Sequence, residues 1–220
     1  MTARTVSTGA PARRQTAAAR RERARARPAE ILDAARDLFS RKGFEAARMD
    51  EVAAAAGVTK PAVYRYFPGK DRLIEALLEE DLAIPFRRLA AWVEAHPGPI
   101  GEIVEGFSDR VSGMQHSGLT RAYLMLALDE AGRRPEIADF IRNQVLAPGL
   151  IVLAKAFHQA MARGELARGN DPRFMARMFF APFLQTSLGT VGYALPVGDA
   201  AERKRYGQFH TTAFLRAFAV

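Results

Sequence analysis

Apolar residues recur every three or four positions along most of the chain, and from residue 100 onward no stretch sustains an alternation of apolar and polar residues. This spacing places apolar side chains on one face of a helix, where they can be buried together. Two clear stripes run through residues 31–39 and 73–82. Further helices are predicted over residues 100–115, 119–132, 135–162, 172–191 and 200–218. The pattern predicts an all-α protein.

Prolines are expected to interrupt two of the longer helices. A helix beginning at Lys70 should kink or end at Pro85, because proline lacks an N–H and its ring crowds the preceding turn. Pro148-Gly149 should break or bend the helix over residues 135–162 for the same reason.

Residues 49–67 predict two short helices joined at Gly57, since glycine readily adopts the conformation of a sharp turn. Thr59 can cap the second helix. Val63 and Phe67, four positions apart, can bury against the first helix. The rest of the second helix forms an outward cationic and aromatic face: Lys60, Ala62, Tyr64, Arg65 and Tyr66. A short helix with such a face, held at an angle by a turn, is suited to the major groove of DNA.

The spaced pattern over residues 29–80 resembles the DNA-binding domain of TetR/AcrR-family transcriptional regulators. The positions that carry the resemblance are Gly43, Phe44, Val52, Ala53, Ala56, Gly57, Val58, Tyr64, Phe67, Lys70 and Leu73. Arg48 and Met49 depart from the family pattern, which usually has Thr or Ser there to cap the helix. The resemblance implies a three-helix helix-turn-helix domain over residues 29–74, followed by a larger helical effector-binding and dimerisation domain over residues 75–220.

The resemblance also implies a function. Members of the family are homodimers that bind double-stranded DNA at a near-palindromic operator, and a small-molecule effector releases them. Most are repressors, although activation stays open for this chain. In the family, the helix that here begins at Lys70 transmits effector binding to the DNA-binding domain.

Candidate DNA contacts follow from the outward face of the second short helix. Residues 60–62 and Arg65 are expected to contact base edges, and an arginine there would favour guanine through O6 and N7. Tyr64, Tyr66 and Lys70 are expected to contact phosphates. Lys70 lies at a helix amino end, which favours anions, but it can also be an ordinary surface lysine. The full predicted set is Arg25, Arg27, Arg48, Thr59, Lys60, Pro61, Ala62, Tyr64, Arg65, Tyr66 and Lys70.

Most of the net charge of +8 lies in residues 1–28, which contain eight arginines and one acid, Glu22. This segment has almost no large apolar residue, so we expect it to be disordered alone, with the first helix opening at Pro28. Arg25 and Arg27 belong to its dense basic end. The segment can be an arm that contacts phosphates or the minor groove, an inert solvated tail, or a targeting sequence.

Apolar side chains between residues 92 and 157 can line an effector pocket or form plain core. The pocket candidates are Trp92, Phe107, Val111, Met114, Tyr123, Leu126 and Phe157. The last two predicted helices are apolar on every side and therefore need cover on every side. A partner subunit, as in the family, or burial within one protomer can provide it. The dimer-interface candidates are Phe179, Phe183, Leu184, Phe209 and Phe214.

Several classes of chemistry lack their residues. Cysteine is absent, which excludes a disulfide framework, a thiolate zinc site and a cysteine nucleophile. The four histidines are scattered, and neither a phosphate-binding glycine loop nor a nucleophile elbow occurs. No run of eighteen apolar residues and no apolar signal core is present. We therefore expect a cytoplasmic protein that is not an enzyme, without cofactor, metal or membrane partner.

Two other functions remain open. A nucleoid-type protein would bind nucleic acid without sequence preference through the basic segment. A helical enzyme would use its basic end to dock on anionic partners.

Overall fold

The computed structural model describes residues 17–114, 135–190 and 198–220, except for the side chains of residues 17–27 and 188–190. Within these ranges the regular structure is helical, apart from one isolated bridge between Leu166 and Ala219. This confirms the predicted all-α class. The predicted helix over residues 119–132 lies outside the described residues.

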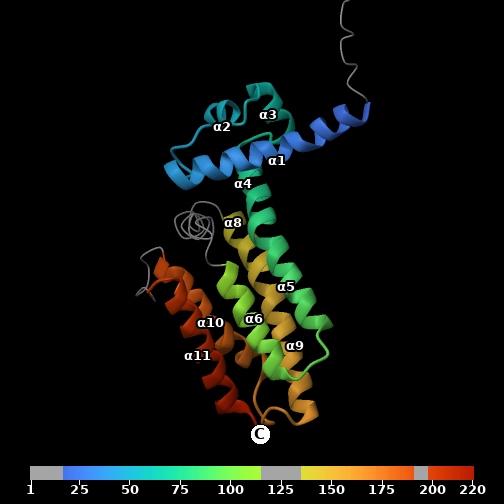
Figure 1. Ribbon diagram of the computed structural model, residues 1–220, viewed down its shortest axis with the longest axis vertical. Coiled ribbons are helices and arrows are strands. Elements are labelled where there is room, and N and C mark those ends of the chain that lie inside the picture. The colour runs from blue at the N-terminus through green and yellow to red at the C-terminus, as the bar shows by residue number, and fades with distance from the viewer. Residues whose placement is uncertain (1–16, 115–134, 191–197) are drawn as a thin grey trace, which may run out of the picture.

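The helices form a head and a body (Figure 1). The head comprises α1 (Ala17–Lys42), α2 (Met49–Ala55), α3 (Lys60–Tyr66) and α4 (Lys70–Leu78). The body comprises η1 (Glu79–Ala83), α5 (Ile84–Ala95), α6 (Ile100–Met114), α8 (Pro135–Phe140), η2 (Ile141–Leu146), α9 (Ala147–Arg163), α10 (Pro172–Thr190) and α11 (Ala200–Phe218).

The first helix begins earlier than expected. We predicted a disordered segment up to residue 28, but α1 already starts at Ala17 and includes Pro28. Residues 17–27 consist only of Ala, Arg and Glu, which are all good helix formers. The lack of large apolar side chains in this segment limits tertiary packing, but it does not prevent a helix from forming locally. This part of α1 projects beyond the rest of the head (Figure 1).

Head and body each have their own core. In the head, Ile31 of α1, Val52 of α2 and Val63 of α3 are fully buried together. Ile137 of α8 belongs to the head core although it follows in sequence more than half of the body. The helix that begins at Pro135 therefore starts against the head and ends at Arg163 in the body.

At both prolines that were expected to interrupt a helix, the chain forms a wider helical turn and the helix does not break. The π-helical segment η1 precedes Pro85, and η2 precedes Pro148. In each, the chain donates a hydrogen bond five residues back, from Ile84 N–H to the Glu79 carbonyl in η1. A wider turn gives room to the proline ring, and the helix continues past it. The two π segments also contact each other.

Residues Pro135–Arg163 are long and apolar enough to cross a bilayer by length and composition. Within this stretch, α9 packs against α5 and α10 and contributes Leu153 and Phe157 to the body core. A core helix passes the same test of length and apolarity, and these contacts account for its composition.

Candidate DNA-contacting surface

The turn between α2 and α3 fixes how α3 is presented. Gly57 has a φ of 65°, in the left-handed region that favours glycine. After the turn, Val63 packs into the head core together with Val52. Because these two buried side chains hold α3 by one face, its opposite face points outward. Both the turn and the buried positions are where the sequence predicted them.

Aromatic and cationic side chains occupy the outward face of α3. Tyr64 is 39% exposed, Arg65 is exposed and Tyr66 is half-buried. The Arg65 guanidinium lies 4.9 Å from the Tyr66 ring centroid, and its Nη2 donates a hydrogen bond to the Tyr66 hydroxyl at 3.0 Å. This contact limits the rotamers of Arg65, so its charge is held on the surface of α3.

Lys60 is already engaged within the head. Its Nζ lies 2.7 Å from Asp50 Oδ1 of α2 and 5.9 Å from the centroid of the Tyr64 ring. The hydrogen bond that Lys60 donates to the Asp50 carboxylate raises the pKa of Lys60. A base or phosphate contact by Lys60 would therefore compete with Asp50, a cost the sequence did not reveal.

The start of α3 differs in detail from the expectation. Thr59 occupies the N-cap position, but its side chain makes no capping hydrogen bond. Pro61 lies in the first turn and is exposed, and Ala62 is half-buried. These three residues lie at the amino end of the outward face of α3, and a DNA contact by them remains a prediction.

Glu51 stabilises the start of α2, where Arg48 replaces the Thr or Ser that is usual in the family. Arg48 is the exposed N-cap of α2, and the Glu51 side chain accepts a hydrogen bond from its backbone N–H at 2.9 Å. Lys42 donates to the same carboxylate at 2.6 Å. The Lys42 hydrogen bond, followed by the Arg48 N–H, lowers the pKa of Glu51. The spacing of Glu51 three residues after Arg48 was the signal for this half of a capping box.

Lys70 links two segments of the head. Its Nζ donates a hydrogen bond to the Glu45 carbonyl at 3.1 Å and lies 4.1 Å from the Phe44 ring centroid. The ammonium group is therefore placed between the amino end of α4 and the loop before α2. A phosphate contact by Lys70 remains a prediction.

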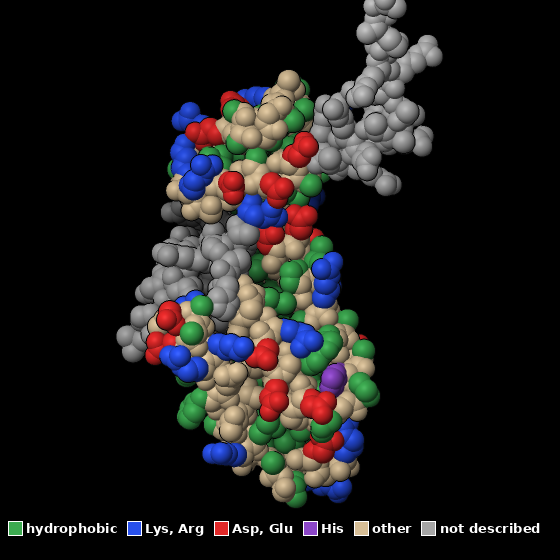
Figure 2. Space-filling model, in the orientation of Figure 1, with side chains coloured by type: hydrophobic (Ala, Val, Ile, Leu, Met, Phe, Trp, Pro, Cys, Tyr) green, Lys and Arg blue, Asp and Glu red, His purple; other side chains and the backbone are tan. Residues whose placement is uncertain are grey.

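The part of the head from residue 29 to residue 74 is nearly neutral. Residues 29–74 carry eight basic and seven acidic side chains, and the two kinds are interspersed on the face drawn in Figure 2. Arg25 and Arg27 lie in the amino-terminal part of α1, where side chains are not described. Strong attraction to phosphates would thus have to come from the basic residues before residue 29, whose dense end lies in the amino-terminal part of α1.

The residues predicted to line an effector pocket are mostly core. Phe107 and Phe157 are fully buried, Val111 is buried, and Trp92 and Met114 pack at the edge of the body core. Phe107 contacts the rings of Phe179, Phe180 and Phe183. Tyr123 and Leu126 lie outside the described residues. A cavity of about 220 Å³ between α6 and α11 is lined by none of these residues.

The dimer-interface candidates divide between core and surface. Phe179, Phe183 and Phe214 are buried within the protomer, so their rings do not reach its surface. Leu184 and Phe209 are exposed, Phe209 by 71%. Phe174 and Met178 of α10, apolar residues outside the five interface candidates, are also exposed and lie four residues apart. We call the exposed apolar residues of these two helices the α10–α11 face: Phe174, Met178, Leu184 and Phe209.

A helix-turn-helix head on a larger helical body defines a class of bacterial DNA-binding regulators. Residues 31–77 match the family model described as bacterial regulatory proteins, tetR family. Residues 104–200 match the model of the tetracyclin repressor-like C-terminal domain. The chain belongs to the TetR family of transcriptional regulators, as the resemblance indicated. Members of this family bind DNA, dimerise and respond to small-molecule ligands, typically as repressors, and they are not enzymes.

Relatives and solved structures agree with this assignment. The HTH-type transcriptional regulator UidR of Escherichia coli is 26% identical over 149 residues, which cover 67% of this chain and 73% of UidR. The A-factor receptor protein of Streptomyces griseus is 25% identical, over 70% of this chain and 51% of its own length.

Two solved structures share the fold. A TetR-family regulator from Mesorhizobium loti superposes with a TM-score of 0.71 at 20% identity, covering 90% of this chain and 99% of its own. SmeT, solved in complex with triclosan, gives a TM-score of 0.73 at 22% identity over 89% and 92% of the two chains. SmeT is the repressor of a multidrug efflux pump of Stenotrophomonas maltophilia.

Proposed function

We propose that this protein is a cytoplasmic, homodimeric repressor that binds a near-palindromic operator and is released by a small-molecule effector. The observation that carries the proposal is the outward face of α3, on which Tyr64 and Arg65 are exposed while Val63 is buried. In a dimer, two-fold symmetry would present this face twice, to successive major grooves about 34–36 Å apart.

The α10–α11 face supports dimerisation. Phe174 and Phe209 expose 68% and 71% of their surface, and large exposed apolar patches mark protein contacts. The two helices pack against each other, so a second copy would cover both at once. The buried rings Phe179 and Phe214 would act indirectly, by holding the two helices together from below.

The basic segment would supply most of the attraction to phosphates, since residues 29–74 have almost no net charge. The helical start at Ala17 places its dense basic end on a projection of α1. If about three arginines of each arm engage phosphates, deleting residues 1–28 would change the log–log salt slope of the dimer by roughly 5. An unchanged slope would assign the segment as an inert tail.

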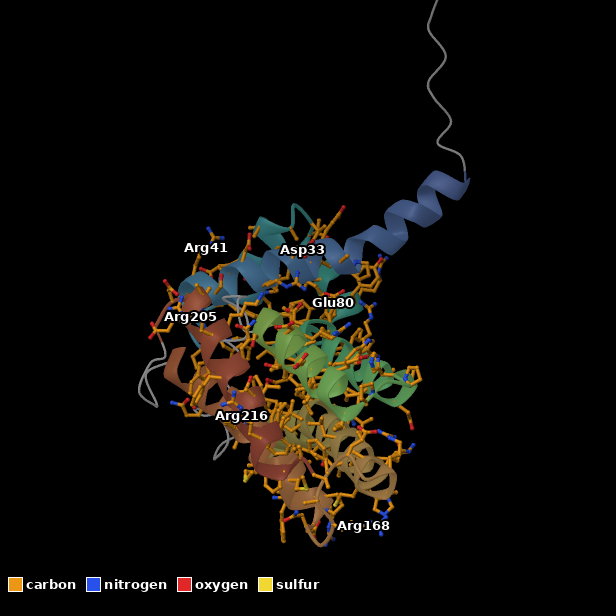
Figure 3. The ribbon with its side chains drawn as sticks, turned by 60° about the horizontal axis from the view of Figure 1, so that its bottom comes forward. Asp33, Arg41, Glu80, Arg168, Arg205 and Arg216 are labelled. Atoms are coloured by element: carbon orange, nitrogen blue, oxygen red, sulfur yellow. The ribbon has the colours of Figure 1, made fainter. Side chains whose placement is uncertain are left out.

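A charged cluster joins head and body at η1. Arg36 of α1 donates from Nε and Nη2 to both carboxylate oxygens of Asp81, at 3.0 and 2.8 Å, and from Nη2 to Glu80 at 2.8 Å. Its Nη1 also donates to Asp33, and Figure 3 labels Asp33 and Glu80 near each other at this junction. The side chains of Arg36 and Asp81 are only 18% and 14% exposed, which makes this pair costly to separate.

Effector release needs a difference in binding between two states. An effector in the body would displace DNA only if it bound the DNA-incompetent arrangement of the heads more tightly. A tenfold loss of DNA affinity requires about 1.4 kcal/mol of such preference. The contacts of Arg36 with η1, and of Ile137 with the head core, are the routes by which a shift of the body helices would reach α3.

The proposal is tested by selecting bound sites from random duplex DNA. We expect an enriched near-palindrome whose half-sites repeat with the helical turn of DNA. The concentration of positive charge in residues 1–28, beside the near-neutral residues 29–74, also fits a second candidate, a protein that binds DNA without sequence preference. Enrichment of no sequence, together with equal competition by bulk DNA, would favour this second candidate and contradict the repressor.

A further inference from the structure

The groove between α6 and α11 has a polar lining that neither the α3 face nor the α10–α11 face uses. The two helices lie side by side in the body (Figure 1) and leave a cavity of about 220 Å³. Its lining residues are Glu105, Ser108, Asp109, Gln208, Thr211 and Thr212. We propose that this groove binds a small organic cation, namely a short aliphatic amine or diamine.

Two acidic side chains give the groove its charge. Glu105 and Asp109 are exposed and lie four residues apart on α6, so they are neighbours on one helix face. Like charges at this spacing destabilise a helix. Within the described part of the chain, no ion pair or hydrogen bond engages either carboxylate. A cation bound between them would relieve their repulsion.

A buried hydroxyl provides an independent indication of a ligand. Ser108 lines the groove, is only 3% exposed, and makes no hydrogen bond among the described residues. The Ser108 oxygen is not one of the fully enclosed, unpartnered side-chain atoms of the described residues, so its remaining accessible surface faces the groove, where it can accept a hydrogen bond. An ammonium N–H in the groove would give the Ser108 oxygen its partner.

The far wall of the groove also accepts hydrogen bonds. Thr211 donates its hydroxyl proton to the Gly207 carbonyl at 2.9 Å, so its oxygen remains an acceptor. A Cβ at Gly207 would lie 3.1 Å from Ser108 Oγ and 3.2 Å from Ser112 Oγ. The glycine thus lets α11 approach the serine hydroxyls of α6 closely. The carboxylates of the α6 wall, together with hydroxyl oxygens on both walls, select a ligand that donates.

Size and ligand number favour an amine over a metal ion or a drug-sized molecule. Among the described residues, no group of three or more His, Cys, Asp or Glu side chains is placed to hold a metal. The cavity volume of about 220 Å³ is below the roughly 300–1,000 Å³ of pockets for drug-sized ligands. A short diamine matches the small volume and can reach both carboxylates.

The test is calorimetric titration of the full-length, DNA-free protein with 1,4-diaminobutane. Two probes have the same four-carbon chain but different end groups: 1,4-butanediol is neutral and succinate is an anion. We expect saturable binding of the diamine at one site per chain, weaker at high salt because the contact is ionic, and no binding of the diol or succinate. Absence of saturable diamine binding at millimolar concentration, or equal binding of succinate, would overturn the proposal.

Variants locate the site. The double substitution Glu105→Gln/Asp109→Asn should weaken diamine binding at least tenfold, and Ser108→Ala should weaken it several-fold. The matched control Asp37→Asn/Glu136→Gln removes the same charge from exposed positions outside the groove and should bind like the wild type. Undiminished binding by the groove double variant would refute the assignment. DNA is absent from every arm, so this outcome is independent of operator recognition.

Discussion

The head and the body both carry aromatic side chains on their helices, yet the sequence separated inward from outward positions only in the head. On α3, Val63 is buried while Tyr64 and Arg65 are exposed, as their spacing predicted. On α10 and α11, three of five predicted interface residues belong to the protomer core. A helix with one apolar stripe has one possible inner face, whereas a helix that is apolar all round has several.

The largest expected effect comes from the aromatic core of the body. Phe179→Ala removes a fully buried ring that packs against Phe107, Phe157 and Phe214. It should lower the free energy of unfolding by about 3–5 kcal/mol, measured by denaturant titration. Phe209→Ala is the matched surface change; it should weaken association of the subunits and leave the intrinsic stability of the protomer nearly unchanged. Equal losses of intrinsic stability in the two variants would abolish the distinction between core and face.

The next effect concerns the α10–α11 face. Phe209→Glu places a charge on the proposed subunit contact and should weaken dimerisation by at least about 2 kcal/mol, or roughly thirtyfold, while the helical content is retained. Sedimentation equilibrium measures this shift. Ile151→Glu is the control, because Ile151 is 69% exposed on α9, outside this face. Dimers of unchanged strength in Phe209→Glu would move the subunit contact elsewhere.

In the head, removing the charge of Arg65 tests base recognition most directly. Arg65→Ala should cost about 1–3 kcal/mol on the selected operator and relax its sequence preference, as measured by DNA-binding titrations on cognate and random duplexes. Arg88→Ala changes an exposed arginine of the body and should leave both affinities unaltered. If Arg65→Ala lowers affinity for cognate and random DNA equally, Arg65 contacts phosphate and does not read bases.

The smallest effect is a pH dependence of the packing between α10 and α11. His210 stacks on Phe179 and donates from Nε2 to the Phe179 carbonyl at 2.9 Å. Burial lowers the pKa of His210 below 6.5, more than the hydrogen bond raises it. Near that pH the unfolded chain binds more protons, so stability is full above pH 6.5 and decreases below it. His210→Asn should flatten this decrease in thermal unfolding, whereas His158→Asn should retain it.

Much of the architecture was predictable because it depends on local signals. The helices over residues 100–114, 135–163, 172–190 and 200–218 follow from periodicity, and Asp199 caps the last by accepting from the Glu202 N–H. Other features depend on competition between local signals. Propensity carried α1 back to Ala17, and the π turns before Pro85 and Pro148 kept both long helices continuous.

The candidate sites were predictable only where the spacing of residues within a single helix decides which side chains are exposed. The exposure of Arg65 followed from the burial of Val63. The pairing of Lys60 with Asp50, and of Arg36 with Asp81, joins residues from different helices, and no single-helix pattern specifies such contacts. The polar groove was missed for the same reason, since its walls at Asp109 and Thr211 are about a hundred positions apart in sequence.

The central claim is that a dimer presents two copies of the α3 face at the spacing of duplex DNA. The chain lacks cysteine, so Pro61→Cys introduces a unique label at the exposed amino end of α3. The distance between spin labels in the DNA-free dimer can then be measured by electron–electron double resonance. We predict a separation of about 34–36 Å or slightly more. A separation far below one helical turn of duplex DNA would contradict the account. So would the absence of any coupling between two spin labels because the protein is monomeric.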